Sequence, residues 1–111
     1  MELTKSVHEN NVIILEIKGE VDAYAAQEFN STMLGLLDLG HRRIVLDVSK
    51  LMFISSAGIR AILFAHKEAV HLGGEIRIIG PTDQVCRIFE ITGLLEILQI
   101  ADGLQEAIND W

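Results

Sequence analysis

The first eighteen residues alternate between apolar and polar positions in two short runs. Leu3–Val7 is a weak alternating segment, and Val12–Lys18 is a stronger one that is rich in β-branched residues. The tripeptide Glu9–Asn11 between them suits a tight turn. The pattern therefore predicts an antiparallel hairpin whose second strand ends at Gly19.

Beyond Gly19 the apolar spacing changes to that of amphipathic helices separated by short apolar runs. Four helices are predicted. The first covers Ala23–Leu39, is capped by Asp22 and is stopped by Gly40, and the second runs from about Ser56 to Leu72 and is ended by Gly73 and Gly74. The third is capped by Thr82, carries Val85, Ile88 and Phe89, and is followed by Gly93; the last is capped by Asp102 and has Leu104, Ala107, Ile108 and Trp111 on one stripe. The runs between them predict three strands: Arg43–Val48, Ile76–Ile79 and an edge strand at Ile97–Ile100.

This order of elements predicts an α/β fold. After the hairpin, strands alternate with helices three times, and the connections are long enough for parallel crossovers. We therefore expect a mixed sheet of four to five strands packed with about four helices. The chain of 111 residues has one proline, Pro81, and no low-complexity stretch or repeat, so residues 1–111 are expected to form one domain.

Composition and charge narrow the possible partners. Half of the residues are apolar, enough for a packed core, and the formal net charge is −7. An acidic chain argues against binding to nucleic acid or to an anionic membrane, which require a basic face. No apolar run is long enough to span a bilayer, and the first residues lack the pattern of a signal peptide. We expect a cytoplasmic domain without membrane or nucleic-acid partners.

The chain offers few residues for cofactor or metal chemistry. It contains no phosphate-loop, dinucleotide-binding or zinc-protease motif, and its one cysteine, Cys86, has no partner for an internal disulfide. Its four histidines (His8, His41, His66 and His71) are scattered, and His66 and His71 lack the spacing of a metal pair. We therefore predict neither a cofactor nor a metal.

The segment from Leu51 to Arg60 follows a buried strand and opens a helix, with Ser55 and Ser56 at the junction. One interpretation is structural: serine is a favoured helix cap, and the small pair Ala57-Gly58 lets the helix start close to the sheet. The other is functional. A phosphoryl group on a serine at this point would meet free N–H groups and the positive end of the helix dipole, and would add about −1.5 to −2 in charge.

Two catalytic alternatives use residues of the same region. A serine on a strand-to-helix turn resembles the nucleophile of serine hydrolases, with His66 or His71 as the base, but the first glycine of the G-x-S-x-G motif is missing. A receiver domain with Asp47 as phosphoacceptor would need an acidic pair after the first strand, and Leu3–Val7 is not followed by one. Both alternatives rank below a binding domain.

Three segments together resemble the STAS domain of bacterial anti-sigma-factor antagonists: Gly19–Asp22, Ile44–Asp47 and Phe53–Gly58. The resemblance covers nearly the whole chain and implies a protein that is not itself an enzyme. In that family the domain binds an anti-sigma factor that is also a serine kinase, and so frees a sigma factor. Phosphorylation of one serine breaks the complex, and a metal-dependent serine phosphatase restores binding. By position, Ser56 matches the phosphoacceptor and Asp22 the acidic residue beside it.

The chain departs from the family pattern at two positions. Ser55 stands where many members have Asp, which removes a carboxylate, and Ala57 stands where a second hydroxyl often follows. The second departure favours Ser56 as acceptor, with Ser55 as runner-up. A STAS domain can also be a constitutive scaffold, in stress-signalling assemblies or beside transporters, and this alternative stays open.

Helical spacing predicts a docking face next to Ser56. An outward stripe is expected to contain Ser56, Arg60, Phe64 (or Leu63), Lys67 and His71, and an inward one Ile59, Ile62, Leu63, His66 and Val70. Phe64 is either a core residue or an exposed anchor, and Arg60 is either a solvated charge or a partner for a phosphate. The predicted partner-binding set is Asp22, Ser55, Ser56, Ala57, Gly58, Arg60, Phe64 and Lys67.

Overall fold

The computed structural model describes all 111 residues and contains one mixed sheet of six strands. The strands are β1 (Glu2–His8), β2 (Val12–Val21), β3 (Arg43–Asp47), β4 (Leu51–Ile54), β5 (Glu75–Ile79) and β6 (Ile100–Ala101). Their order is β1-β2-β3-β5-β6, and β4 pairs with the end of β2. Only the β1–β2 pair is antiparallel, so the predicted hairpin and the mixed α/β sheet are confirmed.

Four α-helices accompany the sheet, as predicted: α1 (Ala25–Asp38), α2 (Ser56–His71), α3 (Asp83–Thr92) and α4 (Leu104–Ile108). Two short 3₁₀ turns cover Glu9–Asn11 and Leu94–Glu96. The predicted cap of α3 is present, since Thr82 Oγ1 accepts a hydrogen bond of 3.3 Å from the N–H of Val85. Gly93 ends this helix in the left-handed conformation that favours glycine, with a φ of 80°.

Three elements differ from the prediction. The second strand does not stop at Gly19, because a φ of 96° there and a shift of register let β2 bend and pair with β4. That pairing adds the strand Leu51–Ile54, which the sequence analysis missed and which brings the sheet to six strands. The last strand is only Ile100–Ala101, because Leu94–Glu96 forms a 3₁₀ turn. Asp102 does not cap α4, whose first flanking residue is Gly103 and has no side-chain cap.

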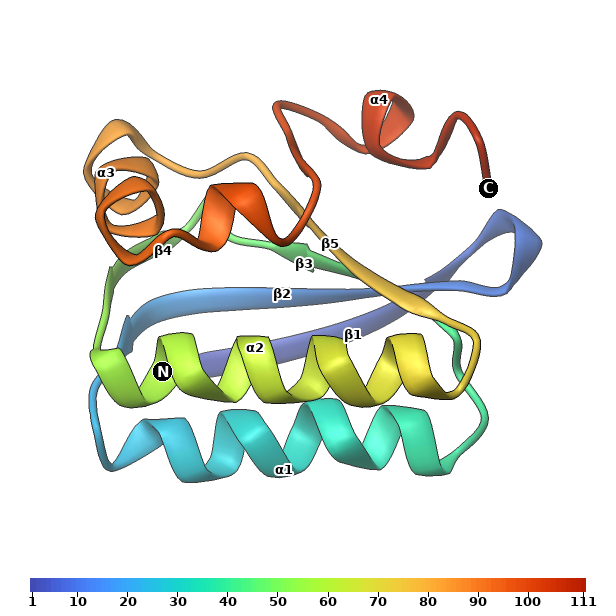
Figure 1. The fold of residues 1–111 in the computed structure, drawn as a ribbon, viewed down its shortest axis with the longest axis horizontal. Helices are drawn as coiled ribbons and strands as arrows, with labels where there is room; N and C mark the ends of the chain where they lie inside the picture. Colours follow the sequence, from blue (N-terminus) through green and yellow to red (C-terminus); the bar gives the residue numbers. More distant parts are fainter.

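The helices cover the two faces of the sheet unequally (Figure 1). α1 and α2 lie side by side on one face, where the larger core cluster contains, among others, Leu15, Ile17, Met33, Ile44 and Ile62. α4 lies on the other face, where its predicted stripe packs on a smaller cluster of Val12, Val45, Ile79 and Ala107. α3 packs beside β4.

The parallel crossovers also set the direction of the helices. α1 and α2 both begin at the end of the sheet where β2, β3 and β4 finish, and both run back toward the hairpin turn (Figure 1). The positive ends of two helix dipoles therefore lie at the same edge of the domain. The turn of the β1–β2 hairpin and the loop from α1 to β3 lie at the opposite end.

Candidate functional site

The site begins where β2 and β4 end together. Val21 is the partner of Ile54 in the parallel ladder, and the N–H of Ser55 donates to the carbonyl oxygen of Val21 at 2.8 Å. The chain therefore leaves the sheet at the same edge in both places, toward Asp22 after β2 and toward Ser55 after β4. In this way the fold brings together residues that are more than thirty positions apart in the sequence.

The two serines of the junction have different environments. Ser55 is the N-cap of α2, and its Oγ accepts a hydrogen bond of 3.2 Å from the N–H of Gly58. Ser56 is the first residue of the helix, is exposed, and makes no side-chain hydrogen bond. The capping interpretation is therefore correct for Ser55, whereas the Ser56 hydroxyl takes no part in capping the helix. The first N–H groups of the helix lie next to that hydroxyl and have no partner within the helix.

Gly58 is buried and positions the start of α2. A Cβ at this position would lie 2.6 Å from Cγ1 of Ile54 and 2.9 Å from Cγ1 of Val21, closer than real Cβ atoms come. The helix can therefore pack this tightly against the ends of β2 and β4 only because the side chain is absent. The contribution of Gly58 to the predicted partner-binding set is indirect, since it sets the position of Ser56, whereas Ala57 is half-buried beside it.

Asp22 lies at the start of α1. Its Oδ1 accepts a hydrogen bond of 2.7 Å from the N–H of Ala25, so the predicted capping contact is present although the regular helix begins at Ala25. The carboxylate is exposed. It offsets the positive end of the α1 dipole, whereas the start of α2 has no acidic residue in its first turn.

The exposed face of α2 follows the predicted stripe. Ser56, Arg60, Phe64, Lys67 and His71 are all exposed, and Phe64 retains 51% of its accessible surface. Phe64 is therefore exposed and is not a core residue. The prediction is wrong for Val70, which is 55% exposed, because the last turn of α2 packs on the core through Ala69, and the next residue along the helix points away from it.

A shallow groove runs between α1 and α2 next to this stripe. It is lined by Ala23, Ala26, Gln27, Asn30, Ala57, Arg60, Ala61 and Phe64. The alanines keep the groove open, and Arg60 and Phe64 form part of its wall. The groove was not predicted, because it depends on how two helices far apart in sequence pack together.

Three further exposed apolar side chains belong to the elements that meet at the Ser56 edge: Tyr24, Met52 and Phe53. Met52 and Phe53 lie on β4, where Leu51 and Ile54 point into the core and these two do not. The apolar run Leu51–Ile54 could have indicated a strand. Because all four residues are apolar, the pattern did not indicate that Met52 and Phe53 would be the exposed ones.

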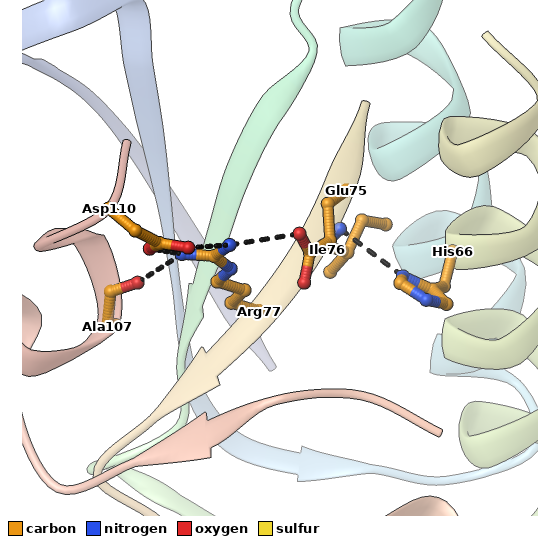
Figure 2. Close-up of polar contacts among 6 residues, drawn as sticks. All are labelled: His66, Glu75, Ile76, Arg77, Ala107 and Asp110. Atoms are coloured by element: carbon orange, nitrogen blue, oxygen red, sulfur yellow. Dashed lines mark hydrogen bonds and ion pairs between the residues drawn. The ribbon is translucent and has the colours of Figure 1, made fainter. Parts of the chain in front are cut away.

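The structure separates the residues of the hydrolase alternative. His66 and His71 lie on the same helix as Ser56, ten and fifteen residues further on, which is about 15 and 22 Å along the axis. His66 is half-buried, and its Nδ1 accepts a hydrogen bond of 3.3 Å from the N–H of Ile76 (Figure 2). Burial lowers the pKa of His66, against the opposing charge of Glu75. Neither imidazole is placed to act as a base for Ser56.

Asp47, the residue of the receiver alternative, lies at the end of β3. Its Oδ1 accepts hydrogen bonds from the N–H of Ser49 at 3.0 Å and from the hydroxyl of Ser49 at 2.7 Å. The carboxylate therefore stabilises the turn between β3 and β4. No group of three or more His, Cys, Asp and Glu side chains is arranged to hold a metal ion.

The sequence did not predict that an arginine would be buried. Arg77 on β5 is 3% exposed, donates to the carbonyl of Ala107 at 2.6 Å, and forms ion pairs with Glu75 and Asp110 (Figure 2). Its guanidinium also lies 4.0 Å from the ring centroid of Trp111. Burial by itself lowers the pKa of Arg77, but the two carboxylates outweigh it and raise the pKa above its ordinary value. Arg77 thus fastens the C-terminal helix to the sheet.

The fold and the site define a small mixed α/β domain with a free serine hydroxyl at the start of its second helix. The family model of the STAS domain matches residues 4–107. The chain therefore belongs to the STAS family, as the resemblance implied. No helix is both long and apolar enough to cross a membrane.

Two curated proteins are similar to this chain in sequence. BtrV of Bordetella bronchiseptica, provisionally named an anti-sigma factor antagonist, is 32% identical over 98 residues, which cover 88% of this chain and 84% of BtrV. The anti-sigma-B factor antagonist of Staphylococcus aureus is 25% identical over 91 residues, which cover 82% of this chain and 84% of the relative.

Solved structures show the same fold. A Thermotoga maritima protein, also provisionally named an anti-sigma factor antagonist, superposes with a TM-score of 0.90 at 25% identity, covering 97% of this chain and 92% of that one. The anti-sigma factor antagonist SpoIIAA in its unphosphorylated form gives a TM-score of 0.74 at 16% identity, covering 95% and 92%. At that identity the likeness to SpoIIAA shows the fold alone.

Proposed function

We propose that this protein is an anti-sigma factor antagonist that is switched by phosphorylation of Ser56. In its unphosphorylated state it binds an anti-sigma factor that is also a serine kinase, and so releases a sigma factor. The protein itself performs no catalysis: the kinase modifies it, and a serine phosphatase restores it. The names of BtrV and of the S. aureus relative support the antagonist role.

One observation favours Ser56 over Ser55 as the phosphorylated residue. The hydroxyl of Ser55 is engaged as the cap of α2, whereas that of Ser56 is exposed and free, one residue further along the same helix. A kinase can therefore reach Ser56 without disrupting the capping contact. The solved structure of SpoIIAA in a phosphorylated form shows that a protein of this fold can carry the modification.

The surroundings of Ser56 suit a reversible change of charge. The phosphoryl group would adjoin the unpaired N–H groups and the positive dipole end of α2, which favour an anion. Arg60 lies one helical turn further on the same exposed face and can pair with it. The domain thus accommodates the phosphate without refolding, and the partner is displaced by the added bulk and by about two negative charges.

The proposed partner surface surrounds this serine. It consists of the exposed or half-buried members of the predicted set, namely Asp22, Ser55, Ser56, Ala57, Arg60, Phe64 and Lys67. Phe64 supplies an aromatic anchor between two positive charges, a combination enriched at interfaces. Asp22 adds a carboxylate at the adjoining helix start.

The test is an assay of phosphorylation by the cognate kinase with ATP, read by mass spectrometry of the intact protein. Wild type and Ser55→Ala should each gain one phosphate, and Ser56→Ala none. The Ser55 variant is a matched control, because it removes a neighbouring hydroxyl and only weakens the cap. Undiminished phosphorylation of Ser56→Ala would disprove the assignment.

A binding experiment tests the consequence of the modification. Ser56→Asp should bind the kinase partner more weakly, by a few kcal/mol at most, because an unpaired charge in an interface is costly. Ser56→Ala should bind like the unphosphorylated wild type. Equal binding of all three forms, together with a stable large complex that carries no phosphate, would favour the constitutive scaffold instead.

A further inference from the structure

The largest cavity of the domain lies at the end opposite to Ser56. The turn of the β1–β2 hairpin and the loop that joins α1 to β3 lie together at this end of the domain (Figure 1). Residues of these two segments line a hollow of about 520 Å³. Its wall includes Asn10 and Asn11 from the hairpin turn, His41 and Arg42 from the loop, and Arg43 from the start of β3. The function proposed for Ser56 makes no use of this cavity.

The charge of this cavity differs from that of the whole molecule. The chain carries sixteen acidic residues and a net charge of −7, yet none of the eight residues lining the cavity is acidic. Two of them are arginines and a third is a histidine. Basic groups concentrated in a hollow of an acidic protein create a local positive potential and favour an anionic ligand.

Both arginines are held in place without being neutralised. Nη1 of Arg42 donates to the carbonyl oxygens of Leu37 and His41, at 3.0 and 2.9 Å. Nη1 of Arg43 reaches the carbonyl oxygen of Asn10 at 3.5 Å. Carbonyl oxygens orient a guanidinium but carry no net charge. Each guanidinium has five N–H donors, so most of them remain available.

The third arginine at this end of the sheet shows the contrast. Arg77 is paired with Glu75 and Asp110, whereas neither Arg42 nor Arg43 forms an ion pair with a carboxylate. The hydrogen bonds from Arg77 lower the pKa of the Asp110 carboxyl, and the charge of Arg43 adds a smaller effect in the same direction. Glu75 also lines a smaller neighbouring hollow together with Arg42 and Arg43. Carboxylates therefore lie near the two arginines, but none of them forms an ion pair with either guanidinium.

We propose that this cavity binds a multiply charged anion of the phosphate class. The two guanidinium groups would take the phosphoryl oxygens, and the carboxamides of Asn10 and Asn11 would supply further donors. Planar guanidinium groups match the geometry of phosphate oxygens, and the volume is that of small-molecule sites in proteins. The ligand is either inorganic phosphate or pyrophosphate, or the phosphoryl end of an organic phosphate.

The probes are sodium phosphate, sodium pyrophosphate and adenosine monophosphate, titrated at constant ionic strength into the ¹⁵N-labelled full chain. The expected result is a set of saturable amide shifts confined to residues 10–11 and 40–43. Arg43→Gln should weaken binding about tenfold or more, since it removes a charge-assisted contact. Arg87→Gln is the matched control, because Arg87 is exposed on α3 and away from the cavity. Tighter binding of the monophosphate than of either inorganic anion would identify an organic phosphate.

Several results would overturn the proposal. Shifts that do not saturate at millimolar anion, or that spread over the lysines and arginines of the whole surface, would show only ionic screening. An equal loss of affinity in Arg43→Gln and Arg87→Gln would have the same meaning. A hexaglutamate peptide that binds more tightly than pyrophosphate would indicate an acidic protein partner. Arg43→Lys retains the charge and should recover part of the affinity, which controls for damage to the fold.

Discussion

The contact of Gly58 with the ends of β2 and β4 gives a prediction whose sign can be worked out from the structure. In Gly58→Ala the new Cβ would lie 2.6 Å from Ile54 and 2.9 Å from Val21. Both neighbours are β-branched and have few alternative rotamers, so α2 itself must move outward. Overpacking of this kind costs about 1–3 kcal/mol, against which alanine gains roughly 1 kcal/mol in helix propensity.

Gly35 in α1 offers the matched control. A Cβ at Gly35 would meet nothing within 4 Å, so Gly35→Ala should gain roughly 1 kcal/mol from propensity alone. The difference between the two variants then isolates the packing cost, about 1–3 kcal/mol.

Urea denaturation followed by circular dichroism measures both changes in the free energy of unfolding. The slope with urea should be the same in wild type and variants. The reasoning is refuted if Gly58→Ala is as stable as Gly35→Ala, because the helix would then have room that the structure denies. A loss in Gly58→Ala with unchanged phosphorylation of Ser56 would show that the outward shift leaves the hydroxyl accessible.

Three other predictions concern stability. Arg77→Ala should destabilise the domain by about 2–4 kcal/mol in thermal unfolding, because it leaves the buried end of α4 without its anchor and two carboxylates without their partner; a loss below about 0.5 kcal/mol would contradict that role. The lowered pKa of His66 means that its contribution to stability is complete above pH 6.5 and falls as the pH drops below that value, so urea midpoints at pH 7.5, 6.5 and 5.5 should decline less steeply in His66→Gln. Thr82→Ala should cost about 1 kcal/mol through loss of the α3 cap, and Thr82→Ser should retain most of it.

Periodicity and capping residues predicted most of the fold. The hairpin, the four helices and the caps at Asp22 and Thr82 all follow from local spacing, because each is decided by residues within a few positions of one another. The exposure of Ser56 and the cap at Ser55 are also local consequences of starting a helix there. The position and exposure of the residues around Ser56 were therefore largely predictable. The exposure of Phe64 and Val70 was not, because it depends on how α2 packs against the rest of the domain.

The elements that were missed depend on distant partners. β4 exists because β2 bends at Gly19, more than thirty residues earlier, and Leu51–Ile54 alone shows no alternation. The burial of Arg77 depends on Asp110, thirty-three residues later, so its charge gave no hint of an interior position. The cavity beside Arg42 likewise forms only when the hairpin turn meets the loop after α1.

The shared edge at which α1 and α2 begin has a consequence for how fast the protein is degraded in the cell. Because two positive helix ends meet there, a dianion on Ser56 would stabilise the folded chain or leave its stability unchanged. Proteases that remove proteins through their unfolded fraction would then degrade the modified form no faster than the unmodified one. Phosphorylation would therefore change the choice of partner without lowering the amount of the protein.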